Sequence, residues 1–378
     1  MRDRITVSLK IFAKKMSREI QTYLYYCYYF CGRKTLYILF FSFLFNLKPS
    51  FSANKIIPKV KIAIIHSYPV GEWYYGINNG LKSKLKEFNV DSSLSLLSYD
   101  YESLKNKTNV ERKKAVNEIL ASLTKEKLDF VVICDDEAAL QMGSLVIEKL
   151  KKKVIFVGIN HTPYTNWMST IDKSLFSVVH EKYPIDKSVD MLKKLMPNLK
   201  TISILSSAGY TSILVSKQAR ESHAKIKKLK LRRVLNSSSW EEWKQFLKEE
   251  NNISHNSLWI LVPYEVFNEK KETVNIKEIG DWIRANTKLP TIGIISIHTK
   301  MGLLASIAVN PEGVGFQAAE QIFQILNGSS QEAIGAEATR YHNFEINLTE
   351  ARRLNIEIPS QFLGIAKFVE NQELPYGK

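Results

Sequence analysis

The stretch Phe130-Val-Val-Ile-Cys-Asp-Asp-Glu-Ala-Ala139 is the clearest indication of the fold class of this chain. Its first five residues form a short apolar run rich in β-branched side chains, which is typical of a strand buried on both faces of a sheet. An amphipathic stretch from about Glu137 to Lys149 follows and predicts a helix. A buried strand that leads into a helix is the repeating unit of a parallel α/β sheet.

The same alternation extends to both sides of this stretch. Val60–Ile65 and Val154–Gly158 are further apolar strand runs, and Val90–Leu97 alternates like a strand. Tyr74–Phe88 and Val110–Lys125 carry apolar residues at helical spacing.

The alternation of predicted strands and helices begins again near residue 180. Beyond Pro184 we expect helices over Ile185–Met196, Ile213–Lys227, Trp240–Glu249 and Val274–Asn286, and strands over Thr201–Leu205, Leu231–Leu235, Leu258–Val262 and Thr291–Ile295. These strand–helix units are too many for one small sheet. We therefore predict an α/β protein with two doubly wound, Rossmann-like lobes, with a single TIM barrel as the competing architecture.

Residues 1–53 differ from the rest and predict an export leader. Basic residues precede the apolar run Leu36–Leu47, and small residues that favour cleavage after Ser52 follow it. That order is typical of a secretory signal peptide, and the run is shorter than the roughly 20 residues that span a membrane. The alternative is an uncleaved anchor over Ile20–Leu47, which would place Arg33-Lys34 at mid-membrane depth.

Almost half of the formal charge of +15 lies in the leader. Residues 1–53 hold nine of the 53 Lys and Arg and two of the 38 Asp and Glu, so without them +8 of the +15 remains. The densest basic stretch, Lys225–Arg233, is predicted to be a solvated corner between a helix and a strand rather than a polyanion site, and we expect no nucleic-acid partner. Cys27 and Cys31 lie in the leader, which leaves Cys134 as a buried thiol and excludes a disulfide framework.

Ligands of open parallel sheets bind beyond the carboxyl ends of the strands, so the residues just after each strand are the candidate site. These residues are His66–Trp73, Asp135–Glu137, Asn160–Pro163, Ser206–Tyr210, Pro263-Tyr264 and Ser296–His298. Their hydroxyl, aromatic and amide groups suit stacking and neutral hydrogen bonds to a small organic molecule. A structural alternative exists for each loop, because Ser67, Asp136, Thr162 and Thr211 are also suited to cap the following helix.

The common enzyme signatures are missing from the sequence. It contains no Gly-x-Gly-x-x-Gly, no Walker-type phosphate loop and no Gly-x-Ser-x-Gly elbow. The seven histidines show no paired short spacing, so no metal site is predicted. Asp135-Asp136 stays a candidate catalytic or metal-binding pair, although adjacent side chains at a strand end point in different directions. We expect no catalytic residue and no cofactor.

The order of the motifs resembles that of the ABC-transporter substrate-binding proteins of the type I periplasmic-binding-protein superfamily. The opening segment Ile64-Ile-His-Ser-Tyr-Pro-Val-Gly-Glu-Trp73 is similar to the branch that begins with a strand, His-Ser-Tyr and a downstream Trp. The other similar segments are Cys134–Ala139, Pro290–Gly293, Gly302–Ser306, Gly313–Ala319 and Ile325–Gly328. The resemblance spans about residues 59–368.

This resemblance implies two lobes joined by a three-segment hinge and closing around a ligand. Lobe one would comprise residues 57–178 and 304–328, and lobe two residues 179–303 and 329–370. By position, it implies that Ser67, Tyr68, Trp73 and Asp136 line the cleft, and the strand-end loops add Asn160, Tyr210, Tyr264 and His298. Because Asn160-His-Thr-Pro163 departs from the Thr-Asp-Pro-like loop of many relatives, the identity of the ligand is not inherited.

The resulting expectation is an exported, monomeric solute-binding protein in the periplasmic or extracytoplasmic space. It would capture a small organic ligand and present it to a membrane ABC permease, which reads the closed form. The alternative is an extracytoplasmic sensing module that signals to a separate membrane histidine kinase. A sugar-responsive regulator of the lac-repressor type shares the fold but needs an N-terminal helix-turn-helix, where this chain has the leader; an enzyme is the last alternative.

Overall fold

The computed structural model of the chain describes residues 59–104, 107–160, 166–226 and 228–370. The leader at residues 1–53, with its signal-peptide and anchor interpretations, lies outside the described residues. Among the residues described, no helix has both the length and the apolar character needed to cross a membrane.

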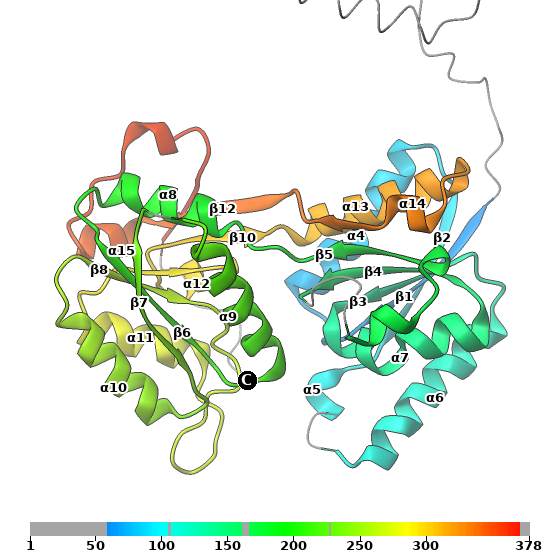
Figure 1. Ribbon diagram of the computed structural model, residues 1–378, viewed down its shortest axis with the longest axis horizontal. Helices are drawn as coiled ribbons and strands as arrows, with labels where there is room; N and C mark the ends of the chain where they lie inside the picture. Colours follow the sequence, from blue (N-terminus) through cyan, green and yellow to red (C-terminus); the bar gives the residue numbers. More distant parts are fainter. Residues whose placement is uncertain (1–58, 105–106, 161–165, 227, 371–378) are drawn as a thin grey trace, which may run out of the picture. The chain divides into compact units, whose positions relative to one another are not determined.

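The first of two open sheets, sheet A, is parallel throughout (Figure 1). Its strands lie in the order β11 (Ala336–Ala338), β5 (Phe176–His180), β4 (Lys153–Ile159), β3 (Phe130–Cys134), β1 (Val60–His66) and β2 (Ser92–Ser98). The apolar run Phe130–Cys134 therefore forms β3, near the middle of this sheet.

The second sheet, sheet B, holds the strands of the second half of the chain. Its strands lie in the order β13 (Lys367–Val369), β12 (His342–Asn347), β10 (Ala305–Val309), β9 (Thr291–Gly293), β8 (Asn256–Ile260), β6 (Thr201–Ser206) and β7 (Lys230–Asn236). The β10–β12 pair is antiparallel, in contrast to the purely parallel pairing expected. Two separate open sheets confirm the two-lobed α/β fold and exclude the TIM barrel.

Successive side chains of a strand point to opposite faces of its sheet. Because the strands of sheet A are apolar at both sets of positions, both faces of the sheet are apolar. Ile62 and Ile64 pack toward α4 (Glu72–Glu87) and α13 (Pro311–Leu326). Ala63 and Ile65 pack toward α6 (Asn109–Lys125) and α7 (Asp135–Leu150), which cover the opposite face (Figure 1). Helices thus cover both faces, as the near-continuous apolar strands predict.

Sheet B is covered in the same way. Ile202 and Ile204 share a cluster with residues of α8 (Ile185–Leu195) and α9 (Tyr210–His223). Leu258 and Ile260 pack with residues of α10 (Trp240–Asn251) and α11 (Ile276–Asn286). The shorter elements are α5 (Tyr101–Leu104), α12 (Ile297–Lys300), α14 (Gln331–Ile334), α15 (Leu348–Arg353), η1 (Asn166–Thr170), η2 (Lys173–Leu175) and η3 (Ser360–Phe362).

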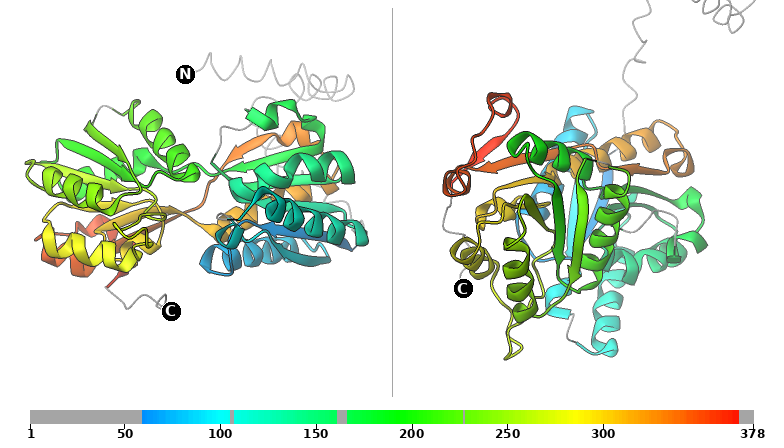
Figure 2. Two further views of the ribbon diagram at one scale, coloured as in Figure 1. Left: turned by 90° about the horizontal axis from the view of Figure 1, so that it is seen from below. Right: turned by 60° about the vertical axis from the view of Figure 1, so that its left-hand side comes forward.

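The chain passes between the two sheets three times (Figure 2). It leaves sheet A after β5, returns between β10 and α13, and leaves again between β11 and β12. Strand pairing differs here from the expected boundaries 304–328 and 329–370, because β10 belongs to sheet B and β11 to sheet A. The difference has a physical reason: partners brought together by the fold, β12 for β10 and β5 for β11, decide which sheet a short strand joins.

Two helices begin earlier than the sequence pattern indicates. α7 begins at Asp135 and α9 at Tyr210, so Asp136 and Thr211 lie inside first turns rather than at N-caps. Ser67 does not cap α4 either, because the N-cap of that helix is Gly71. The capping interpretation of these three residues is therefore wrong, and that of Thr162 falls outside the described residues.

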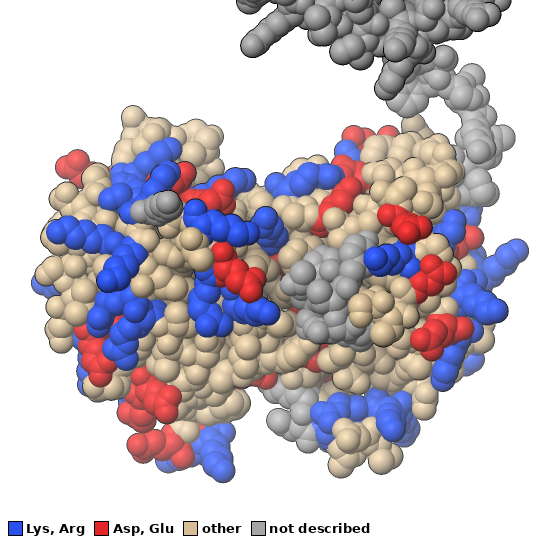
Figure 3. Space-filling model, in the orientation of Figure 1, with Lys and Arg blue, Asp and Glu red and all other residues tan. Residues whose placement is uncertain are grey.

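Within the basic stretch, Lys225, Ile226, Lys228 and Leu229 lie between α9 and β7, as predicted, and Lys230–Arg233 are the first residues of β7. Lys228 pairs with Asp190, and Arg232 and Arg233 pair with acidic residues of α10. On the face shown in Figure 3, Lys and Arg are interspersed with Asp and Glu. The basic charge of this stretch is thus partly balanced by neighbouring carboxylates.

Glycines let α4 and α13 touch backbone to backbone. A Cβ atom added at Gly80 would lie 2.0 Å from the carbonyl oxygen of Glu312, and one added at Gly315 would lie 2.2 Å from that of Ile77. No side chain fits at these two positions without moving one helix away from the other.

We expect Gly315→Ala to lower the free energy of unfolding by about 1–3 kcal/mol, because the added methyl group overpacks the α4–α13 contact. Gly364→Ala is the matched control, since a Cβ at Gly364 would meet no atom within 4 Å. Urea unfolding of the two variants measures the difference, and equal midpoints would contradict the close contact.

Candidate functional site

The carboxyl ends of four neighbouring strands of sheet A carry polar residues. Ser67 follows β1, Asp135 follows β3, Asn160 follows β4 and Glu181 follows β5, and these strands are adjacent in the sheet. All four residues are buried. The strand-end rule thus identifies one edge of sheet A as a cluster of buried polar groups.

Trp73 and Asp135 are joined by a hydrogen bond at this edge. The indole Nε1 of Trp73, in the first turn of α4, donates to Asp135 Oδ1 at 2.8 Å. The backbone of Asp135 has φ 69°, in the left-handed region that residues other than glycine seldom adopt. Gly158 makes room for the pair, because a Cβ there would lie 2.9 Å from Asp135 Oδ1 and 3.2 Å from the Trp73 ring. Backbone strain at a site of this kind is held in place by the surrounding structure.

Asn160 connects two further carboxyl groups. Its side-chain Nδ2 donates to Asp136 Oδ2 and to Glu181 Oε2, each at 3.1 Å. Its backbone N–H donates to Asp136 as well. The other oxygen of Glu181 accepts a bond of 2.8 Å from the hydroxyl of Tyr183. One amide therefore holds carboxylates from α7 and from the end of β5 close together.

Burial raises the pKa values of three carboxyl groups at this edge. Desolvation, reinforced by the nearby Glu181, raises the pKa of Asp135 well above its ordinary value. Desolvation also raises the pKa of Glu181 to about 7, and it raises that of Glu137, with help from Asp136, to about 7. Each of these carboxyl groups takes up a proton more readily than an exposed carboxyl group.

The predicted site residues of the first loop differ in their surroundings. The Ser67 hydroxyl donates to the Cys134 carbonyl and accepts from the Ala138 N–H, so it ties the loop to the first turn of α7. The Tyr68 ring is half-buried and lies edge-on to Tyr101. Ser67 thus has partners within the protein, whereas Tyr68 and the half-buried Trp73 present part of their surface.

The predicted residues of sheet B fall into two groups. Tyr210 and Tyr264 are 42% and 44% exposed, respectively. His298 is completely buried, with Nδ1 accepting from the Ile294 N–H at 3.1 Å, and burial lowers its pKa to about 3. The two tyrosines are therefore accessible, and His298 lies inside the lobe.

Side chains after the strands of the two sheets interact with one another. Tyr68 forms a hydrogen bond with Thr211 of α9, and Asp136 raises the pKa of Tyr210 after the larger effect of burial. Lys300 of α12 pairs with Glu72 of α4 at 3.0 Å. Asp136 and Tyr210, which were predicted from separate loops, therefore lie close together.

Sequence reasoning missed Glu181, Tyr183 and the role of Asp135 as the partner of Trp73. The strand-end rule would have found Glu181 if Phe176–His180 had been read as a strand, but Ser177 and His180 interrupt its apolar pattern. The Asp135–Trp73 contact joins residues 62 positions apart and leaves no local signal.

Metal binding finds no support in the described ranges, which contain no group of three or more His, Cys, Asp or Glu residues arranged to hold an ion. Cys134 is buried with a free thiol, as expected. Burial raises the pKa of this thiol well above its ordinary value, which disfavours the nucleophilic thiolate.

Comparison with known structures identifies the same fold. An open, ligand-free substrate-binding protein with adhesive properties from Clostridium difficile aligns with TM-score 0.60 and 16% identity over 83% of this chain and 100% of that one. An ABC domain from Streptococcus pneumoniae in complex with L-Trp aligns with TM-score 0.55 and 18% identity over 81% and 99%. AraP, an arabinose-binding protein from Geobacillus stearothermophilus, aligns with TM-score 0.51 and 12% identity over 80% and 100%.

The family follows from the sequence match. No curated protein matches the chain. The family model described as "ABC transporter substrate binding protein" matches residues 59–370, which include both sheets and every strand-end residue discussed above. The chain therefore belongs to the family of ABC-transporter substrate-binding proteins.

Proposed function

We propose that this protein is an exported solute-binding protein that captures a small organic ligand and delivers it to an ABC permease. The observation that carries the proposal is the convergence of Trp73, Asp135, Asp136 and Asn160 at the carboxyl ends of adjacent parallel strands. Open α/β sheets bind their ligands at that edge. Tyr68, Tyr210 and Tyr264 supply further aromatic surface, while Ser67 and His298 support the site from inside the lobes.

The proposal also states where the protein acts and which membrane partner it serves. The leader at residues 1–53 would direct the chain to the periplasmic or extracytoplasmic space, where it would act as a monomer without covalent chemistry. A permease encoded beside its gene is the expected partner. A histidine kinase encoded there would favour the sensing alternative instead.

A ligand screen by thermal unfolding tests this function. The exported protein, purified from cells that express the full chain, should gain stability by RT ln(1 + [L]/Kd) with its ligand. Amino acids belong in the screen because the pneumococcal neighbour holds L-Trp, and sugars belong in it because another neighbour is named as an arabinose-binding protein. Nucleosides and short peptides complete the panel. If no solute raises the melting temperature, solute capture is contradicted.

With a ligand in hand, Trp73→Ala should weaken binding by about 1–3 kcal/mol, on the scale of an aromatic anchor. Trp73→Phe separates two contributions, because it keeps an aromatic ring but removes the N–H that Asp135 accepts. Isothermal titration measures both variants, and unchanged affinity of Trp73→Ala would remove this residue from the site.

A further inference from the structure

An ion pair joins the two lobes directly. Oε2 of Glu72, the first residue of α4 in the lobe of sheet A, lies 3.0 Å from Nζ of Lys300, the last residue of α12 in the lobe of sheet B. The two residues are 228 positions apart in the chain. A contact between two lobes that move about a hinge exists only while the lobes lie close together. The pair can therefore stabilise only the closed arrangement.

A hydrogen bond joins the lobes at a second point. Tyr68, in the loop between β1 and α4, bonds to Thr211 in the first turn of α9. Like the ion pair, this bond connects one side chain directly to another, so it needs no ligand as a bridge. Both contacts can therefore form whether or not a solute is bound.

The partners of the ion pair project from elements that are fixed within their lobes. α4, which carries Glu72, touches α13 backbone to backbone. On α12, next to Lys300, the buried Thr299 donates to Glu345 Oε2 at 2.5 Å, and its carbonyl accepts from Asn347 at 2.8 Å; both partners belong to β12. Groups that are held in place beforehand lose less conformational freedom when they meet. The position of the lobes therefore decides whether this pair forms.

Partial exposure to solvent limits the strength of the pair. The side chains of Glu72 and Lys300 are 57% and 32% exposed, and pairs in such positions are weak and are screened by salt. A weak contact is sufficient to shift an equilibrium between two conformations that differ little in free energy. An exposed ion pair changes such a ratio by about 2- to 5-fold.

We propose that the Glu72–Lys300 ion pair and the Tyr68–Thr211 hydrogen bond form a latch that holds the two lobes together before a solute binds. The inference goes beyond the proposed function, because it concerns the lobes and not the solute. Its consequence for affinity rests on the proposed function. If the closed form is the one that binds, the apparent dissociation constant is the intrinsic constant divided by the closed fraction, so a weaker latch means weaker binding.

The distance between spin labels on the two lobes tests the latch in the absence of any solute. Glu118→Cys on α6 and Lys248→Cys on α10 place labels at exposed positions of opposite lobes (Figure 1). Cys27→Ser and Cys31→Ser keep labels off the leader, and Cys134 stays unlabelled because it is completely buried. Double electron–electron resonance on the exported full chain then measures the ratio of closed to open molecules.

Lys300→Glu is the decisive variant. It replaces the attraction to Glu72 with a repulsion of similar size, so the ratio of closed to open molecules should fall about 2- to 10-fold. Adding Glu72→Lys restores a pair of opposite charges and should return the ratio toward its natural value. Lys277→Glu is the matched control, because it breaks a pair of 2.7 Å with Asp281 inside α11 and should leave the ratio unchanged.

A neutral variant keeps the test decisive if the charge reversal impairs folding, which circular dichroism would reveal. Lys300→Gln removes the attraction alone and should lower the ratio about 2- to 5-fold. A distance distribution that neither Lys300→Glu nor Lys300→Gln changes overturns the inference. So does a charge-exchanged double variant that stays as open as Lys300→Glu.

The outcomes separate the latch from the proposed function. A solute found in the thermal screen should bind Lys300→Glu more weakly, by the same factor as the fall in the closed fraction. If the screen finds no solute, solute capture is contradicted, whereas the label distances still decide whether the latch exists.

Discussion

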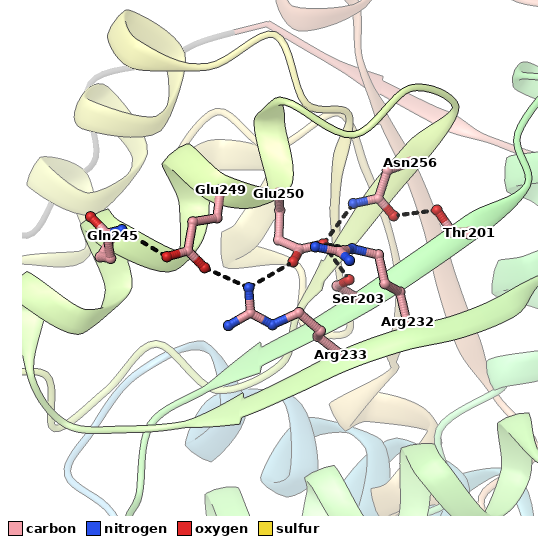
Figure 4. A network of polar contacts seen from close by, with 8 residues as sticks. All are labelled: Thr201, Ser203, Arg232, Arg233, Gln245, Glu249, Glu250 and Asn256. Atoms are coloured by element: carbon pink, nitrogen blue, oxygen red, sulfur yellow. Dashed lines mark hydrogen bonds and ion pairs between the residues drawn. The ribbon is translucent and has the colours of Figure 1, made fainter.

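Replacing Glu250 by Ala should lower the free energy of unfolding by about 3–5 kcal/mol, the scale of breaking a buried ion pair on one side. Glu250 is completely buried in α10, and four side chains hold its carboxylate (Figure 4). Its Oε2 accepts from Ser203 at 2.6 Å, Asn256 at 2.9 Å and Arg232 at 3.0 Å, and its Oε1 accepts from Arg233 at 3.4 Å. Removing the carboxylate takes away the acceptor that Ser203, Arg232 and Asn256 share, whereas Arg233 keeps its pairing with Glu249.

The neighbouring Glu249 is a matched control for this variant. It also pairs with Arg233, but its side chain is 41% exposed. Glu249→Ala should therefore cost at most about 1 kcal/mol, as for other surface pairs. Urea or thermal unfolding followed by circular dichroism measures both variants. Equal losses of stability would show that burial of the network does not matter.

The ligand-free protein should lose about 2–3 kcal/mol of stability through Glu181 as the pH rises from about 5 to 8. Burial raises the pKa of Glu181 from 4.5 to about 7, so the folded protein holds a proton that the unfolded chain releases. The resulting stabilisation is complete below the unfolded value and disappears as the pH passes the folded one. After burial, the nearby Asp136 also opposes the ionisation of Glu181, whereas the hydrogen bonds from Tyr183 and Asn160 favour it; Glu181 in turn raises the pKa of Asp135.

Glu181→Gln isolates this effect, because glutamine keeps the size of the side chain and does not titrate. We expect the variant to show a smaller loss of stability between the two pH values than the natural protein, by about 2–3 kcal/mol in free energy. Glu118→Gln, an exposed substitution in the same lobe, should leave the pH dependence unchanged. Identical pH dependence of Glu181→Gln and the natural protein would mean that Glu181 does not titrate in this range.

The described part of the fold was largely predictable because its signals are local. Apolar runs such as Phe130–Cys134 cannot be exposed, and helical spacing over Val110–Lys125 permits one buried face. Strand pairing was less predictable. The short strands β10 and β11 join the sheets opposite to the expected ones, because their partners come from distant parts of the chain.

The candidate site, like the fold, was predictable from the sequence only in part. The strand-end rule led to Asp136 and Asn160, which do bond to each other. The same rule also predicted His298 as a site residue, although its ring is buried and hydrogen-bonded within its own lobe. A position after a strand indicates where a residue sits along the sheet, whereas the direction of its side chain depends on the packing around it.

The alternating α/β architecture, the number of lobes and the edge of sheet A where polar residues gather all follow from local sequence patterns, because hydrophobic periodicity and strand ends are properties of the local chain. The left-handed backbone of Asp135 against Trp73, and the link from Glu181 to Asp136 through Asn160, arise only from tertiary packing. Those contacts link residues 62, 24 and 21 positions apart. Their energies depend on burial and on distances that form only when the strands pair, and no local pattern encodes them.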